Sequence, residues 1–143
     1  MDWSWTRVRV VVDTNVIAYY LLGTEPFVEE VRRFWRTVKE TFAPVHWEAE
    51  LANAVWMAVR TGVLPADEGH QKLDLAARLG IRSVPSRPLW QPALSRGLSS
   101  GVSVYDTLFV ELASQRSLPL VTFDKKILKI FPDIAHRPVS LAS

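Results

Sequence analysis

The 143-residue sequence contains no cysteine, only two methionines and only six glycines. The missing cysteines exclude disulfides, thiol catalysis and cysteine-based zinc sites. No apolar run approaches the ~20 residues that a membrane-spanning helix needs. The first residues also lack the basic start and long apolar stretch of a signal peptide. We therefore expect a cytoplasmic protein that does not associate with a membrane.

Apolar side chains are abundant by comparison. Hydrophobic residues make up 48% of the chain and charged residues 22%, which is typical of a folded protein and not of a disordered one. The length fits a single domain over residues 1–143, with residues 1–6 as an N-terminal leader. A formal net charge of +2 permits a nucleic-acid partner without requiring one, because local patches decide binding.

Strand-like and helix-like segments alternate along the chain. Short apolar runs predict strands at 8–12, 81–84 and 120–123, and a last edge strand at 136–141. Apolar residues at helical spacing predict helices at 15–22, 27–38, 66–79, 89–96, 103–115 and 124–131. Pro44 is expected to open a further helix that ends near Gly62. The alternation predicts an α/β fold, with a mostly parallel central sheet of about four to five strands flanked by helices.

Four carboxylates lie where predicted strands end or predicted helices begin: Asp13, Glu50, Asp106 and Asp124. Taken singly, each has a structural explanation. Asp13 and Asp124 are suited to be helix N-caps, and Asp106 completes a short capping box with Ser103. Glu50 fits a solvated position near the positive end of a helix dipole.

The joint placement of these acids favours a shared site. Ligands of open α/β sheets bind at the carboxyl ends of the strands, where Asp13 and Asp124 are expected. Glu50 and Asn53 share one helix face, which can point to the same edge. Four close acids cannot all stay charged without a cation, so at least one should have a raised pKa in the metal-free protein. A hard divalent metal would resolve the conflict.

Four motifs, in order, resemble those of PIN-domain ribonucleases, and most closely the small VapC-type toxins of toxin–antitoxin pairs. They are the segments Val11–Asn15, Glu50–Ala54, Tyr105–Ala113 and Leu120–Asp124. The resemblance extends over nearly the whole chain, from Val8 to about Phe131. The chain departs from the family pattern at Thr107, where a small residue is more usual, and in its leader with Trp3 and Trp5.

The resemblance implies an endoribonuclease that depends on Mg²⁺ or Mn²⁺. The family's acidic quartet corresponds to Asp13, Glu50, Asp106 and Asp124. Of these, the resemblance implies Asp13 and Asp106 as metal ligands, Asp124 as a ligand or an acid that supports the ligands, and Glu50 as a ligand or water-orienting base. Supporting residues are expected at Thr14, Asn15, Asn53 and Thr122. The family also implies an RNA substrate, a cognate antitoxin docked on the helices between Phe27 and Ala58, and a homodimer.

Other polar and aromatic residues are less informative. Lys125, Lys126 and Lys129 could contact RNA phosphates, although a solvated helix face explains them equally well. The three histidines are scattered, and we interpret them as incidental. Trp35, Trp47 and Trp56 are expected to pack in the core or in an interface.

Three alternatives to a toxin nuclease remain at this point. The first is a non-catalytic PIN-fold module that binds RNA or protein and uses the acids only as caps. The second is a stand-alone RNA-processing nuclease. The third, a receiver-like phosphoacceptor, is disfavoured because Asp13 lacks the adjacent acid that such a site normally requires.

Overall fold

A computed structural model describes residues 9–141, so the expected leader at residues 1–6 lies outside the described residues. Five parallel strands form one sheet in the order β3-β2-β1-β4-β5. The strands are β1 (Arg9–Val12), β2 (Glu40–Pro44), β3 (Arg82–Val84), β4 (Leu120–Val121) and β5 (Ala135–His136). The predicted parallel α/β architecture is confirmed.

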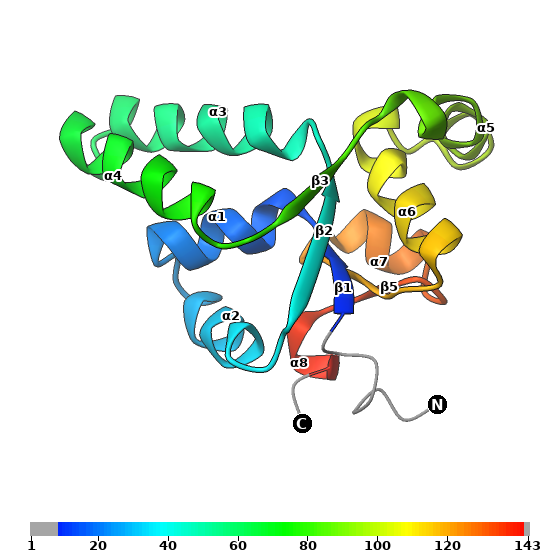
Figure 1. The fold of residues 1–143 in the computed structure, drawn as a ribbon, viewed down its shortest axis with the longest axis horizontal. Helices are drawn as coiled ribbons and strands as arrows, with labels where there is room; N and C mark the ends of the chain where they lie inside the picture. Colours follow the sequence, from blue (N-terminus) through cyan, green and yellow to red (C-terminus); the bar gives the residue numbers. More distant parts are fainter. Residues whose placement is uncertain (1–8, 142–143) are drawn as a thin grey trace.

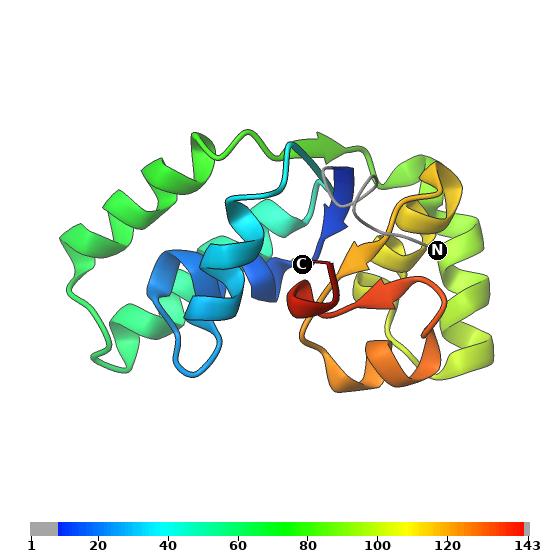
Figure 2. The same ribbon diagram turned by 90° about the horizontal axis from the view of Figure 1, so that it is seen from below.

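Helices cover both faces of the sheet (Figures 1 and 2). The first face carries α1 (Thr14–Leu22), α2 (Val28–Trp35), α3 (Trp47–Arg60) and α4 (Ala66–Ala77). The other carries α5 (Trp90–Ser100), which follows a 3₁₀ turn η2 (Arg87–Leu89), then α6 (Val104–Arg116) and α7 (Lys125–Ile130). A short α8 (Pro138–Leu141) contacts α2. Across residues 9–141, every helix is too short or too polar to cross a bilayer.

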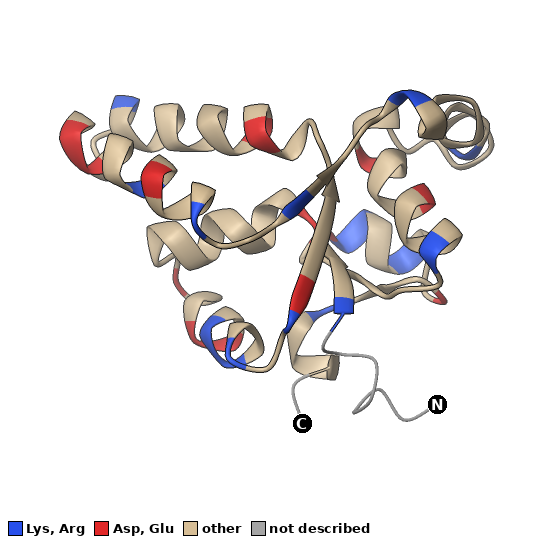
Figure 3. Ribbon diagram, in the orientation of Figure 1, with Lys and Arg blue, Asp and Glu red and all other residues tan. Residues whose placement is uncertain are grey.

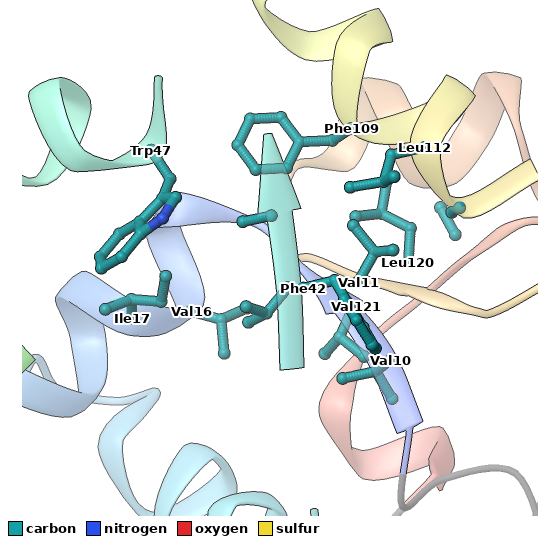
Figure 4. Packing of buried hydrophobic residues seen from close by; sticks show 14 of the residues in the cluster. Val10, Val11, Val16, Ile17, Phe42, Trp47, Phe109, Leu112, Leu120 and Val121 are labelled. Atoms are coloured by element: carbon teal, nitrogen blue, oxygen red, sulfur yellow. The ribbon is translucent and has the colours of Figure 1, made fainter. Parts of the chain in front are cut away.

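The core lies between the sheet and its two helical layers (Figure 4). Val10, Val11 and Val12 of β1 have no exposed surface, as expected for a central parallel strand buried on both faces. Phe109 of α6 packs into the same cluster and is also fully buried. This packing holds the carboxyl ends of β1 and β4 at one edge of the sheet.

The strand order places a topological switch point beside β1. From β1 the chain continues to β2 on one side, and from β3 it crosses back to β4 on the other. The carboxyl ends of β1 and β4 therefore adjoin the position where doubly wound sheets bind their ligands. Asp13 follows β1 directly, and Thr122 follows β4 directly.

The strand β2 was not predicted, and the expectation that Pro44 opens a helix is wrong. Pro44 ends β2, where it pairs with Val84, and α3 begins three residues later. The N–H of Val45 then donates to the Val84 carbonyl at 2.8 Å. A proline without a backbone donor is tolerated at a strand end, so it marks the boundary of the strand here and not of the helix.

The C-terminal segment also differs from the expectation of an edge strand at 136–141. The edge strand β5 ends at His136, and the chain then turns into α8 with Pro138 as its first residue. Proline is suited to the first helical position because its missing N–H has no partner there. In addition, α5 reaches Ser100, four residues beyond its predicted end.

Candidate active site

Asp13 lies at the centre of the site and is buried, with 5% of its surface exposed. It caps α1, because its Oδ1 accepts a hydrogen bond from the Thr14 N–H at 2.7 Å. Its Oδ2 accepts a second one from the Thr122 hydroxyl, also at 2.7 Å. The cap interpretation is therefore correct for one oxygen, while the other joins the end of β1 to the end of β4.

Thr122 and Asn15 connect this carboxylate to the residues that follow β4. The Thr122 hydroxyl, which is fully buried, also accepts from the Asp124 N–H at 3.0 Å. The Asn15 amide lies 3.3 Å from Asp13 Oδ2, and its Oδ1 accepts from the Phe123 N–H at 3.2 Å. Thr122 and Asn15, both predicted as supporting residues, thus orient the backbone and side chains around Asp13 and Asp124.

Asp124 is the N-cap of α7. Its Oδ1 accepts from the backbone N–H groups of Lys126 and Ile127, at 2.9 Å and 3.0 Å. Within residues 9–141, its Oδ2 accepts no hydrogen bond. One oxygen is thus used by the helix, and the other is available to a ligand.

Glu50 reaches the site from α3. Its Oε1 accepts from the Thr14 hydroxyl at 2.7 Å, so Thr14 supports Glu50 as well as Asp13. The same oxygen lies 3.7 Å from Nε2 of His46. Asn53, predicted to support the site, is exposed and has no hydrogen-bond partner in the described part of the chain. The structure therefore joins Glu50 to Thr14 and brings it near His46, while the supporting role of Asn53 stays a prediction.

Asp106 lies in the first turn of α6, and its side chain is half-buried. The N-cap residue Ser103 makes no side-chain hydrogen bond to the helix backbone, so the expected capping box does not form. The Asp106 carboxyl still interacts with the Ser103 side chain, which lowers its pKa against the larger effect of burial. The adjoining Thr107 is fully buried, and its hydroxyl donates to the Ala93 carbonyl at 2.8 Å, which explains a residue larger than the family pattern.

Electrostatics show that the four acids share one environment. Burial, which is the largest cause, and the charges of Asp106 and Glu50 together raise the pKa of Asp13 to about 7, against the lowering effect of the hydrogen bonds from Thr122 and Thr14. Burial also raises the pKa of Asp106, with contributions from Asp124 and Glu50. A raised pKa is therefore expected for Asp13 and Asp106; its largest cause is desolvation, and repulsion from the other acids raises it in addition.

The donor set fits a hydrated hard cation. Among residues 9–141, no three histidine, aspartate or glutamate side chains lie in an arrangement that could already hold a metal ion. One carboxylate oxygen of Asp124 is free of hydrogen bonds to the described residues. The donors are carboxylates, the ligand type that Mg²⁺ and Mn²⁺ prefer, and Mg²⁺ keeps several of its waters and takes few carboxylates.

The lysines on α7 differ from one another. All three are exposed, but the Lys126 ammonium donates to the Gly101 carbonyl at 2.9 Å. Lys125 and Lys129 form no ion pair with any described residue. Figure 3 shows these basic positions on α7, the helix that Asp124 caps. Two of the three predicted phosphate contacts are therefore available.

His46 was interpreted as incidental, and the structure corrects this interpretation. The residue precedes α3, with its Nε2 2.9 Å from the Tyr105 carbonyl and close to Glu50. Tyr105 directly precedes Asp106, so His46 adjoins two acids of the cluster. The signal available in the sequence was the i, i+4 spacing of His46 and Glu50, which places both on one helix face.

A hollow lies between α3 and α4, so it shares α3 with the helices between Phe27 and Ala58 on which an antitoxin is expected to dock. Its volume is about 430 Å³, and its lining residues include Trp47, Leu51 and Leu73. At its polar side, the Trp47 indole donates to the Ser83 hydroxyl at 2.8 Å, which donates to Glu48 at 2.6 Å. Trp47 is buried and Trp35 is half-buried, as expected for core packing, whereas Trp56 is exposed.

Comparisons with known proteins agree with one another. The family model of the PIN domain matches residues 10–132. Ribonuclease VapC3 of Pyrobaculum aerophilum is 29% identical over 128 residues, covering 87% of this chain and 95% of that protein. Ribonuclease VapC3 of Mycobacterium tuberculosis is 30% identical over 129 residues, covering 90% of each.

A solved structure shares the fold. It is a chain of the VapBC2 crystal structure from Rickettsia felis, bound to a DNA fragment from their promoter. The TM-score is 0.63 at 15% identity, covering 90% of this chain and 98% of that one. At this identity the likeness concerns the fold alone.

The raised pKa of Asp13 predicts how stability depends on pH. In the metal-free protein, folded Asp13 stays protonated up to about pH 7, whereas the unfolded side chain ionises near its ordinary value of 3.8. The folded state then binds more protons between these values, so the free energy of unfolding falls as pH rises through this window. Asp13→Asn should remove this loss. The free energy of unfolding of the variant minus that of the wild type should therefore be about 3 kcal/mol larger at pH 8 than at pH 4.

Urea unfolding in EDTA at a series of pH values measures this difference. Asp133→Asn is the matched control, because Asp133 is an exposed acid outside the site, and its variant should keep the pH profile of the wild type. Parallel profiles for Asp13→Asn and the wild type would show that Asp13 ionises normally in the folded protein.

Proposed function

This chain belongs to the PIN domain family, and from that premise we propose that it is a metal-dependent endoribonuclease that hydrolyses RNA phosphodiester bonds. The observation that carries the proposal is the position of Asp13. It is a buried carboxylate with a pKa raised to about 7, among three further acids at the switch point of a parallel sheet. Such perturbed acids in one place are typical of a catalytic site. The ribonuclease names of its relatives support the same chemistry.

The acids would divide the work of holding a Mg²⁺ or Mn²⁺ ion. Asp13 and Asp106 are the proposed ligands, Asp124 contributes its unused oxygen, and Glu50 serves as a ligand or orients water. When bound, the ion supplies a lowered pKa for a coordinated water and stabilisation of charge on the scissile phosphate. Thr14, Asn15 and Thr122 hold the acids in place through the hydrogen bonds described above.

RNA would approach over α7. Lys125 and Lys129 are exposed beside Asp124 and are proposed to contact phosphates on either side of the scissile bond. Lys126 is already bonded to Gly101 and therefore contributes less. These contacts carry no base specificity, because they neutralise phosphate charge only.

An antitoxin is the proposed protein partner. The structural neighbour is described as a VapBC complex, and a toxin–antitoxin role follows for this chain by analogy. The hollow between α3 and α4 has both apolar and polar lining residues, so it is suited to an amphipathic segment, and Glu48 at its side would pair with a basic residue. A small DNA-binding protein encoded immediately upstream would support this role, whereas its absence would favour stand-alone RNA processing.

A homodimer is proposed through α5. Trp90, Leu94 and Leu98 recur at i, i+4 and i+8 on this helix, and 50%, 44% and 79% of their surfaces are exposed. An exposed apolar stripe of this kind marks a protein interface. A second copy of the chain would cover it in an isologous contact, since each copy presents the same stripe.

Removal of any one acid should abolish most of the cleavage. We expect Asp13→Asn, Glu50→Gln, Asp106→Asn and Asp124→Asn each to lower kcat by at least about a hundredfold. EDTA should stop cleavage of a single-stranded RNA by the purified protein, and Mn²⁺ should restore it.

In the same assay, the double variant in which alanine replaces both Lys125 and Lys129 should have a raised KM for RNA with little change in kcat.

Asp67→Asn, an exposed acid on α4, is the matched control and should keep wild-type activity. Cleavage that persists in EDTA, or in Asp13→Asn at the wild-type rate, would exclude the metal-dependent mechanism. An inactive wild type with bound RNA would instead indicate the non-catalytic binding module.

A charge in the α5 stripe should break the dimer. Leu98→Glu places a carboxylate in an apolar contact, where burial of an unpaired charge is costly. We expect a dimeric wild type and a monomeric variant in analytical ultracentrifugation. Val63→Glu, with Val63 66% exposed after α3, should remain dimeric. A monomeric wild type, or a Leu98→Glu variant that still dimerises, would refute the α5 interface.

A further inference from the structure

We propose that His46 is a positioning residue, whose N–H bond to the Tyr105 carbonyl sets the separation of Glu50 and Asp106. The proposal rests on the proposed function, because it assigns His46 to the same acid cluster. It adds a residue outside the four acids and their predicted supporting residues. The observations are its burial, its two polar contacts and its place between two helices.

His46 connects two elements that are far apart in the sequence. It follows β2, and its ring reaches the first turn of α6, where Nε2 lies 2.9 Å from the Tyr105 carbonyl. Only 14% of the side chain is exposed. The contact spans 59 positions of sequence and is therefore tertiary.

The chemistry of this contact assigns the proton. A carbonyl oxygen only accepts hydrogen bonds, so the hydrogen must reside on Nε2 of His46. The other ring nitrogen, Nδ1, is buried and has no hydrogen-bond partner in the described part of the chain. The ring packs edge-on against Phe109, with the centroids 4.9 Å apart. Phenylalanine would fill this space without burying an unpaired nitrogen, so packing alone does not explain a histidine here.

The position of Nε2 determines the arrangement of two acids. Glu50 lies one helical turn beyond His46 on α3, and its Oε1 is 3.7 Å from Nε2. Asp106 directly follows Tyr105, whose carbonyl receives the hydrogen bond. A single imidazole thus fixes the start of α6 relative to the start of α3.

Thr14 completes this set of contacts. Its hydroxyl donates to the same oxygen of Glu50, so α1, α3 and α6 are joined in sequence through Thr14, Glu50, His46 and Tyr105. Small displacements of reacting groups reduce catalysis strongly, and residues that orient metal ligands affect metal affinity. Loss of the His46 N–H should therefore change both metal binding and turnover.

The test compares two amides at position 46. The amide nitrogen of glutamine can reach the place of Nε2, whereas that of asparagine lies near the place of Nδ1. We expect His46→Asn to weaken Mn²⁺ binding to the RNA-free protein by about tenfold in calorimetry. It should also lower kcat for RNA cleavage by about tenfold at saturating Mn²⁺, with KM for RNA within about twofold of the wild type. His46→Gln should stay within about threefold of the wild type in all three quantities.

His70→Asn, at an exposed histidine on α4, is the control, and all measurements are made well below the melting temperature of each variant. Equal effects of His46→Asn and His46→Gln, whether both harmless or both damaging, would overturn the positioning role. If the wild type binds Mn²⁺ but cleaves no RNA, the proposed function fails, and the calorimetric difference between the amides still decides the role of His46. A wild type that neither binds Mn²⁺ nor cleaves RNA would overturn both.

Discussion

The hydroxyl of Thr122 is the contact on which the arrangement of the acids depends. It donates to Asp13 and accepts from the Asp124 N–H, so one buried group sets the distance between the ends of β1 and β4. Water cannot replace it, because Thr122 has no exposed surface. The central strands, buried on both faces, hold this hydroxyl in position. The packing of the sheet thereby fixes the positions of Asp13 and Asp124 relative to each other.

Burying the acids together disfavours the charged form of Asp13 in the metal-free protein. Burying Asp13 beside other carboxylates raises its pKa, and the neutral form is favoured until a cation compensates the charge. Three of the four acids nevertheless make a structural contact: Asp13 and Asp124 cap helices, and Glu50 accepts from Thr14. The capping interpretation and the metal interpretation are therefore compatible, because a carboxylate has two oxygens.

Much of the fold and the site could be predicted from local patterns. The apolar runs before Asp13 and Thr122 place two acids at strand ends, and the motif order relates the chain to its family. The strand β2 escaped prediction because Glu40–Pro44 is short and ends in proline, which is also a helix-start signal. The spacing of His46 and Glu50 was visible in the sequence, but the contact of His46 with Tyr105 could not be predicted, since Tyr105 is brought near only by tertiary packing. The hollow between α3 and α4 also depends on how two helices pack.

The central claim is that the four acids share one cation site. Carboxyl-carbon NMR of Asp13 across a pH titration, with and without Mg²⁺, tests it most directly. We predict a pKa of about 7 without the ion, and a clear fall when Mg²⁺ is present, because the cation favours the charged carboxylate. An ordinary pKa without metal, or a raised value that Mg²⁺ leaves unchanged, would contradict a shared metal site.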